Sequence, residues 1–197
     1  MTRTRKLLTT LLVLGVAGTL VSLGAFSAFS DTTSNTGNQL TAGSVSIGDN
    51  DATAAMFANV TGGKAGTAVQ RCIKVTYSGT LDSNVKLYTT DSSLGTLAPY
   101  VDVTIEKGTY SGTEPAFPSC TNFAADSGGT IYSGTLSNFR STYSSYANGI
   151  SSYPGSATKW VQNDAVVYRF TYTIQNNNSA QGLTTGSHSF TWESQNQ

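Results

Sequence analysis

Residues that could carry acid–base or metal chemistry are scarce in this chain. Its 197 residues include one histidine, His188, and no G-x-S-x-G motif that would mark a serine nucleophile. A zinc peptidase of the H-E-x-x-H type needs two histidines on one helix, so that motif cannot be formed here. We therefore predict that the protein is not an enzyme and has no catalytic residue, metal or cofactor. His188 is interpreted as a strand-end histidine that is hydrogen-bonded to a neighbour.

An acidic stretch and two glycine pairs are candidate ion-binding sites, and neither matches a known motif. Asp49-Asn50-Asp51 could offer oxygen atoms to calcium, but the EF-hand pattern fails at Ala52 and Thr53. We therefore favour a solvated turn that follows a strand. The glycine pairs Gly62-Gly63 and Gly128-Gly129 are not followed by the Lys-Ser/Thr pair of a phosphate-binding loop.

Tyrosine is the most abundant aromatic residue, with ten copies. Tyr143, Tyr146 and Tyr153 lie among serines, and we expect them to be the best exposed group. Exposed tyrosines can stack on sugars or become buried at a subunit interface. The group therefore indicates either an adhesion surface or a loop whose tyrosines have no such role.

The chain has two cysteines, Cys72 and Cys120. In an oxidising compartment they are expected to pair, and closing the loop between them would stabilise the fold by on the order of 4 kcal/mol. Two buried free thiols are the alternative. A zinc site would need two further ligands.

The amino end has the pattern of a signal peptide. Three basic residues precede an uncharged stretch from Leu7 to Phe29. The small residues Ala25 and Ser27 fit the −3 and −1 positions of a signal-peptidase site, which predicts cleavage between Ser27 and Ala28 and removal of residues 1–27. The alternative is an uncleaved anchor, because the uncharged stretch is long enough to cross a bilayer. No other membrane contact is expected.

Cleavage would change the charge of the protein. The mature chain would keep eight basic and eleven acidic residues, a net charge of about −3. A nucleic-acid-binding protein needs a basic patch, so nucleic acid is not an expected partner. Because the amino end has the pattern of a signal peptide, the sequence predicts a protein that works outside the cytoplasm.

Several stretches alternate apolar and polar residues with a period of two, as half-buried antiparallel strands do. The clearest is Val166 to Ile174, where Val166, Tyr168, Phe170 and Tyr172 share one face. The expected strands cover Gln39–Ile47, Val69–Tyr77, Val85–Leu87, Tyr100–Lys107, Val166–Ile174 and His188–Glu193. One-sided strands of this kind are buried most simply in an antiparallel two-sheet β-sandwich, which we assign to residues 46–197.

One segment has helical spacing instead. Its apolar residues are Leu136, Phe139, Tyr143, Tyr146 and Ile150. We therefore expect a short helix or helical turns near residues 137–147, which Ser137 could cap. Turn-forming residues at 61–64 and 126–129 are expected between strands.

Four blocks of the sequence cover Ala28–Val45, Phe57–Leu87, Tyr132–Leu136 and Trp160–Gln195 and leave out roughly residues 89–130. The first block contains Ala28-Phe29-Ser30-Asp31-Thr32. Together these blocks resemble the TasA/camelysin family of exported bacterial proteins, whose signal peptides depend on a dedicated (SipW-type) signal peptidase. One departure is Thr61-Gly62-Gly63-Lys64, where the family often has a proline-glycine-aspartate turn.

The resemblance implies a jelly-roll-like form of the all-β sandwich. It also implies a secreted structural protein, a subunit of a biofilm-matrix or cell-surface fibre. In such fibres an N-terminal segment of one subunit completes a sheet of the next, which is a form of β-augmentation. Here that segment is residues 28–45, an N-terminal arm or donor strand, with Phe29, Leu40 and Val45 as candidate strand-donation residues.

The expected partner is therefore another copy of the chain, with surface polysaccharide or matrix proteins as further candidates. One alternative is an extracellular binding or adhesion module for polysaccharide or a surface partner. A second alternative is a camelysin-like metallo-endopeptidase, because some family members carry that label. The sequence lacks a recognisable set of metal ligands for such an activity.

Overall fold

The computed structural model describes residues 41–58, 60 and 63–197. The expected signal peptide, its cleavage site between Ser27 and Ala28, and the candidate donor residues Phe29 and Leu40 lie outside these residues. Residues 42–197 form one compact unit. The buried core runs from β2 to β7 inside this unit, so the unit is expected to fold without the preceding segment.

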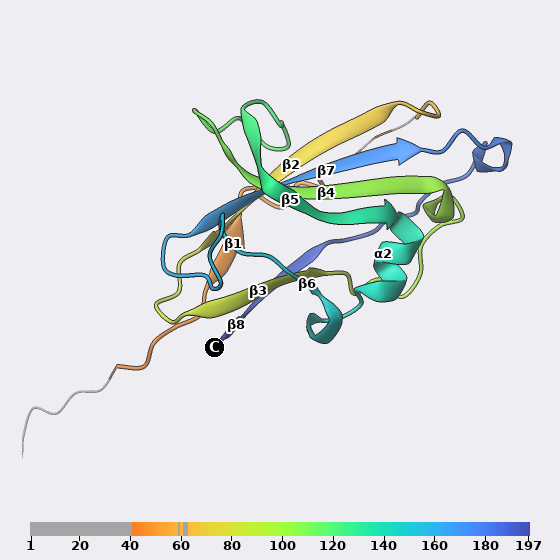
Figure 1. Ribbon diagram of the computed structural model, residues 1–197. Helices are drawn as coiled ribbons and strands as arrows, with labels where there is room; N and C mark the ends of the chain where they lie inside the picture. Colours follow the sequence, from red (N-terminus) through yellow and green to blue (C-terminus); the bar gives the residue numbers. More distant parts are fainter. Residues whose placement is uncertain (1–40, 59, 61–62) are drawn as a thin grey trace, which may run out of the picture. The chain divides into compact units, whose positions relative to one another are not determined.

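In the described part of the chain, two antiparallel sheets pack against each other (Figure 1). The five-stranded sheet has the order β1-β2-β7-β4-β5, and the three-stranded sheet has the order β6-β3-β8. The strands are β1 (Ile47–Asp49), β2 (Ala68–Tyr77), β3 (Ser83–Tyr88), β4 (Val101–Tyr110), β5 (Phe123–Thr135), β6 (Ile150–Ser151), β7 (Ala165–Ile174) and β8 (Thr191–Asn196). With the one helix found among the described residues, α2 (Leu136–Thr142), this confirms the predicted all-β sandwich with a short helical segment.

Alternation along β4 and β7 builds the core as the sequence predicts. Val101, Val103 and Ile105 of β4 are buried, and so are Tyr168 and Phe170 of β7. The opposite face of β4 carries Asp102, Thr104 and Glu106, and that of β7 is mainly polar but includes the buried Val167. Fully burying one such apolar side chain is worth roughly 1.5–3 kcal/mol, so these two strands hold the five-stranded sheet against the other sheet.

Aromatic rings join the two sheets. The ring of Phe170 on β7 lies 4.5 Å from that of Phe190, which precedes β8. The ring of Tyr168 lies 5.3 Å from that of Trp192 on β8. Trp160 is fully buried, and its Nε1 donates to the carbonyl oxygen of Ser152 at 2.6 Å. These contacts fix the position of the three-stranded sheet relative to β7.

The helix is shorter than predicted and starts earlier. It spans Leu136–Thr142, and its cap is Thr135, whose Oγ1 accepts from the Asn138 N–H at 3.1 Å. The predicted cap, Ser137, is therefore wrong, whereas the predicted region does hold a short helix followed by a helical turn. The backbone N–H groups of Ser144 and Ser145 donate to the side chain of Asn148 instead of continuing the helix. Short 3₁₀ turns occur at η1 (Ala98–Tyr100), η2 (Tyr146–Asn148) and η3 (Asn178–Ala180).

The strand predicted from Gln39 to Ile47 begins only at Ile47 within the described residues. The carbonyl oxygens of Ser44 and Ser46 accept from the turn between β2 and β3 at 2.9 Å, from Thr80 and Ser78 respectively. Because these carbonyl oxygens bond to a turn, residues 41–46 do not pair with a neighbouring strand.

The last strand also begins later than predicted, at Thr191 rather than His188. The N–H of Ser189 donates to the Asp91 carboxylate at 2.7 Å, and the Ser189 hydroxyl donates to the same carboxylate at 3.0 Å. A side chain thus takes the place of a neighbouring strand before β8 starts.

The strand β5 was not predicted, because residues 126–129 have the composition of a turn. They form a bulge inside the strand: Glu106 of β4 pairs with Thr130, and Gly108 pairs with Ala125. Gly128 adopts a φ of 67°, a left-handed conformation that favours glycine. The ammonium of Lys107 donates to the Asp126 carboxylate at 2.9 Å and stabilises the bulge.

Candidate binding groove

A large groove opens between the two sheets, on the side where β2 and β8 lie. Ile73 of β2, Tyr172 of β7, Phe190 and Trp192 contribute apolar surface to it. Its volume is about 1600 Å³, which exceeds the usual range of roughly 300–1,000 Å³ for small-molecule pockets. The groove is therefore large enough for a segment of polypeptide chain.

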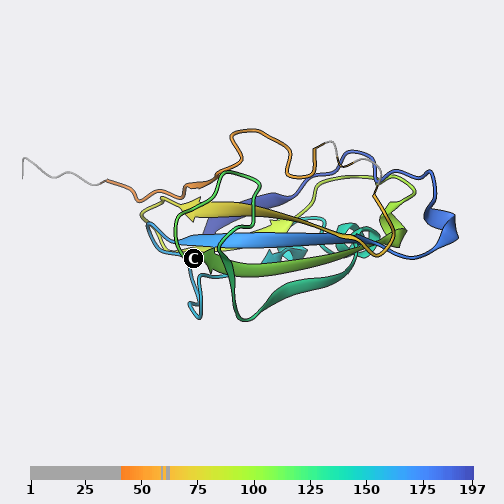
Figure 2. The ribbon, with the colours of Figure 1, turned by 90° about the horizontal axis from the view of Figure 1, so that it is seen from above.

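The segment that follows β1 covers part of this groove. Figure 2 shows it arching past β2. Met56 and Phe57 of this segment are partly buried against the core, and the ring of Phe57 stacks on Tyr172 with 4.0 Å between ring centres. The apolar wall of the groove thus comes from both sheets and from this segment.

One border of the groove is the outer edge of β8. Strand β8 pairs with β3 along its other edge. On that same side, the N–H of Gln197 donates to the carbonyl oxygen of Asp82. Because backbone groups alternate in direction along a strand, the N–H and C=O groups of Trp192 and Ser194 point away from β3. Among the described residues, no strand pairs with this edge and no backbone hydrogen bond reaches it.

The side chain of Trp192 has an unusual position at this edge. Its Nε1 is buried and makes no hydrogen bond of ordinary geometry among the described residues, although it lies near enough to the Tyr168 hydroxyl to act against the rise that burial causes in the pKa of that group. Alternation along the predicted strand His188–Glu193 groups Trp192 with Phe190 on one face, but it does not show that the strand is an open edge.

His188 lies half-buried beside the groove. Its Nε2 lies 2.9 Å from the hydroxyl of Tyr172, so it has the predicted hydrogen bond to a neighbour. Burial raises the pKa of the Tyr172 hydroxyl well above its usual value, and the negative charge of Asp91 raises it further. Tyr172 therefore stays protonated at neutral pH and anchors the histidine.

The expected group of exposed tyrosines is not exposed. Tyr143, Tyr146 and Tyr153 are all half-buried. The ring of Tyr143 packs 5.3 Å from Phe139, while the hydroxyls of Tyr146 and Tyr153 donate to Asn84 at 3.1 and 2.7 Å. These tyrosines hold the loop after α2 against β3, so they do not form a flat platform for sugars.

Asp49, Asn50 and Asp51 form a turn at the end of β1. The N–H of Asp51 donates to the Asp49 carboxylate at 3.0 Å, and the N–H of Thr53 donates to Asp51 at 2.6 Å. Burial raises the pKa of Asp49. Within the ranges that the structure describes, no group of three or more His, Cys, Asp or Glu residues could hold a metal ion.

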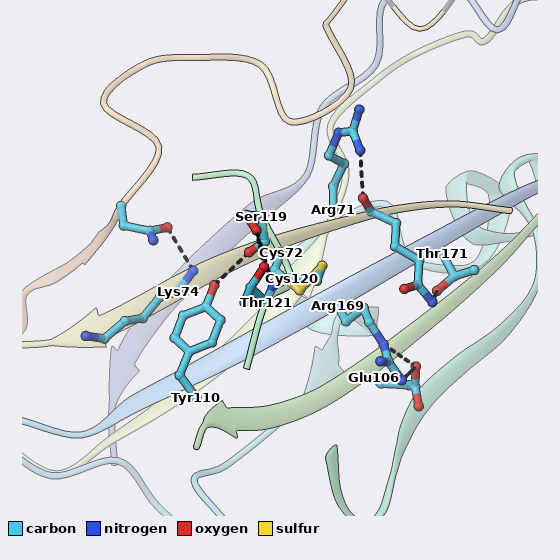
Figure 3. Close-up of a disulfide and its surroundings, with 12 residues drawn as sticks. Arg71, Cys72, Lys74, Glu106, Tyr110, Ser119, Cys120, Thr121, Arg169 and Thr171 are labelled. Carbon is cyan, nitrogen blue, oxygen red and sulfur yellow. Dashed lines mark hydrogen bonds and ion pairs between the residues drawn. A yellow bond between two sulfur atoms is a disulfide. The ribbon is translucent and has the colours of Figure 1, made fainter. Parts of the chain in front are cut away.

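Cys72 on β2 and Cys120, in the loop between β4 and β5, form a disulfide, as predicted (Figure 3). Their Cα atoms lie 5.1 Å apart, and Cys72 is fully buried. Val45, a candidate donor residue, is exposed. It lies between Ser44 and Ser46, which are hydrogen-bonded to the turn after β2.

No model of a known protein family matches this chain, and a search of curated proteins finds no match. In the part of the chain with described structure, no helix is both long and apolar enough to cross a membrane.

Proposed function

We propose that this protein is a secreted structural protein, a subunit of a biofilm-matrix or cell-surface fibre that assembles by strand donation. The observation that carries the proposal is the unpaired edge of β8 beside a groove to which Tyr172, Phe190 and Trp192 contribute apolar surface. An extended segment can add to such an edge through backbone hydrogen bonds while its alternate side chains enter the groove. An uncovered edge also presents unpaired backbone groups that can serve as a template for a strand from another chain.

The proposed donor is the arm of residues 28–45 from a second copy. It contains one acidic residue, no basic residue and no proline, so nothing in its composition prevents strand pairing. Its root is fixed, because Ser44 and Ser46 bond to the turn after β2 of their own chain. The donated part therefore precedes Ser44, and Phe29 and Leu40 are its large apolar side chains.

Two further features support a role outside the cytoplasm. The amino end has the pattern of a signal peptide, and the folded domain contains a disulfide. Disulfides form and persist mainly in oxidising compartments. The resemblance to TasA and camelysin in the arm and in the β2 region agrees with a jelly-roll-like matrix protein.

The polysaccharide-binding alternative rested on exposed tyrosines, and the three tyrosines concerned are half-buried. The peptidase alternative rests on a family label alone. No observation in the described residues favours either one, so we propose a single function.

Negative-stain electron microscopy of purified residues 28–197 tests the proposal. The protein is kept under oxidising conditions and examined over a concentration series. Regular fibres that increase with concentration are the expected result. Protein that stays monomeric at the highest concentration would count against the proposal.

A further inference from the structure

We infer that the outer edge of β2 is a second strand-accepting surface, which a disulfide-held strap keeps closed. The strap is the loop of residues 111–122 between β4 and β5. The partner that fits the uncovered edge is the same extended arm of a second copy, so the inference rests on the proposed function for its donor. Its acceptor edge belongs to the other sheet and is tested separately.

The edge of β2 is blocked at three successive positions. The pairing of β2 with β7 leaves the N–H groups of Cys72, Lys74 and Thr76 pointing away from β7. The Cys72 N–H donates to the carbonyl oxygen of Pro118 in the strap at 3.0 Å, and the Lys74 N–H donates to the Asn50 side chain at 2.9 Å. At Thr76 the short strand β1 covers the edge.

The strap reaches this edge by crossing the outer face of the sheet. It leaves β4 and returns to β5, yet it contacts β2, which lies beyond β7 in the strand order. Its base is closed by Ser111 N–H, which donates to Asn122 O at 2.8 Å. Figure 3 shows Cys120 of the strap beside Cys72, with β7 and Arg169 alongside.

Two non-covalent contacts hold the strap at the edge. Glu114 lies 2.6 Å from the Lys74 ammonium and accepts from the Asn50 side chain at 3.0 Å. The hydrogen bond from Lys74 lowers the pKa of the Glu114 carboxyl, so the pair is charged at neutral pH. Exposed ion pairs of this kind contribute little to stability. The disulfide is therefore the main restraint on the strap.

Phe117 of the strap reaches into the groove. Its side chain is partly buried against the core and lines the same groove as Trp192. The strap therefore covers the backbone N–H of Cys72 and part of the apolar surface beside it, while Asn50 and β1 cover the next two positions. The uncovered edge would carry Arg71 and Lys74, which complement the single acidic residue of the arm.

The test uses residues 42–197 and a synthetic peptide of residues 28–45. Binding stoichiometry is measured by calorimetry, and backbone amide exchange is measured by NMR. The disulfide-bonded protein is expected to bind one peptide, at β8. The variant with Cys72→Ala and Cys120→Ala is expected to bind two, with peptide-dependent protection of the amide at position 72.

One peptide bound by both proteins would overturn this inference and leave strand donation at β8 in place. No peptide bound by either protein would overturn both proposals. If the double variant is unfolded, the disulfide is a general staple and the inference fails. Phe117→Ala, which keeps the disulfide, provides an independent measurement: amide exchange at Cys72 should rise roughly tenfold or more, and unchanged exchange would also overturn the inference.

Discussion

Deletion of residues 28–41 from the mature protein is expected to abolish fibre assembly and to leave the β-sandwich folded. The deletion removes the proposed donor strand but keeps Ser44 and Ser46, whose hydrogen bonds to the turn after β2 belong to the domain itself. The core lies entirely C-terminal to the deletion. Electron microscopy measures assembly, and near-ultraviolet circular dichroism checks the aromatic packing. Fibres formed by the shortened protein would contradict strand donation.

A point variant with a matched control makes the same test without a deletion. In a donated strand, neighbouring side chains point to opposite faces, so Leu40 and Gln39 cannot both enter the groove. Leu40→Asp is expected to prevent assembly because it would bury a charge against apolar side chains. Gln39→Asp makes the same charge change on the other face and should still permit fibres. Equal effects of the two variants would argue against a strand seated in the groove.

Phe170→Ala is expected to destabilise the domain by about 3–5 kcal/mol, the usual cost of removing a buried phenylalanine ring. Phe170 is fully buried on β7, and its ring faces Phe190 at 4.5 Å and Trp192 at 6.1 Å. The change therefore removes contacts that hold the two sheets together. Denaturant unfolding of residues 42–197, followed by tryptophan fluorescence, gives the free energy of unfolding.

Val161→Ala is the control for this measurement. Val161 is an apolar residue with 41% of its surface exposed, so its truncation should change the free energy of unfolding by less than about 0.5 kcal/mol. A loss below about 1 kcal/mol for Phe170→Ala would mean that the sheets do not pack through this ring.

The parts of the fold that the sequence predicts are those with simple periodicity. In β4 and β7 every second residue is apolar, and both strands form close to their predicted limits. The pairing of Cys72 with Cys120 follows from there being only two cysteines.

The parts that were missed depend on contacts between distant segments. The turn-like residues in β5 form a bulge because Lys107 of the neighbouring strand donates to Asp126. The start of β8 is set by Asp91, which lies far away in the sequence and takes the N–H of Ser189. Side-chain composition does not reveal such partners.

The candidate groove was also beyond sequence reasoning. Alternation places Trp192 on an inward face, but it does not show which strands form the edges of a sheet. That depends on strand order, which leaves β8 at an edge of the three-stranded sheet and the strap across the edge of β2. The tyrosines after α2 appeared exposed because they lie among serines, yet Asn84 binds two of their hydroxyls.

The central claim is that a strand from a second copy adds to β8. The most direct measurement is backbone amide exchange in assembled material, compared with monomeric protein and read out at Trp192 and Ser194. Strand donation predicts that both amides, which face away from β3, are protected only in the assembly. Equal exchange of these amides in fibres and in monomers would contradict it.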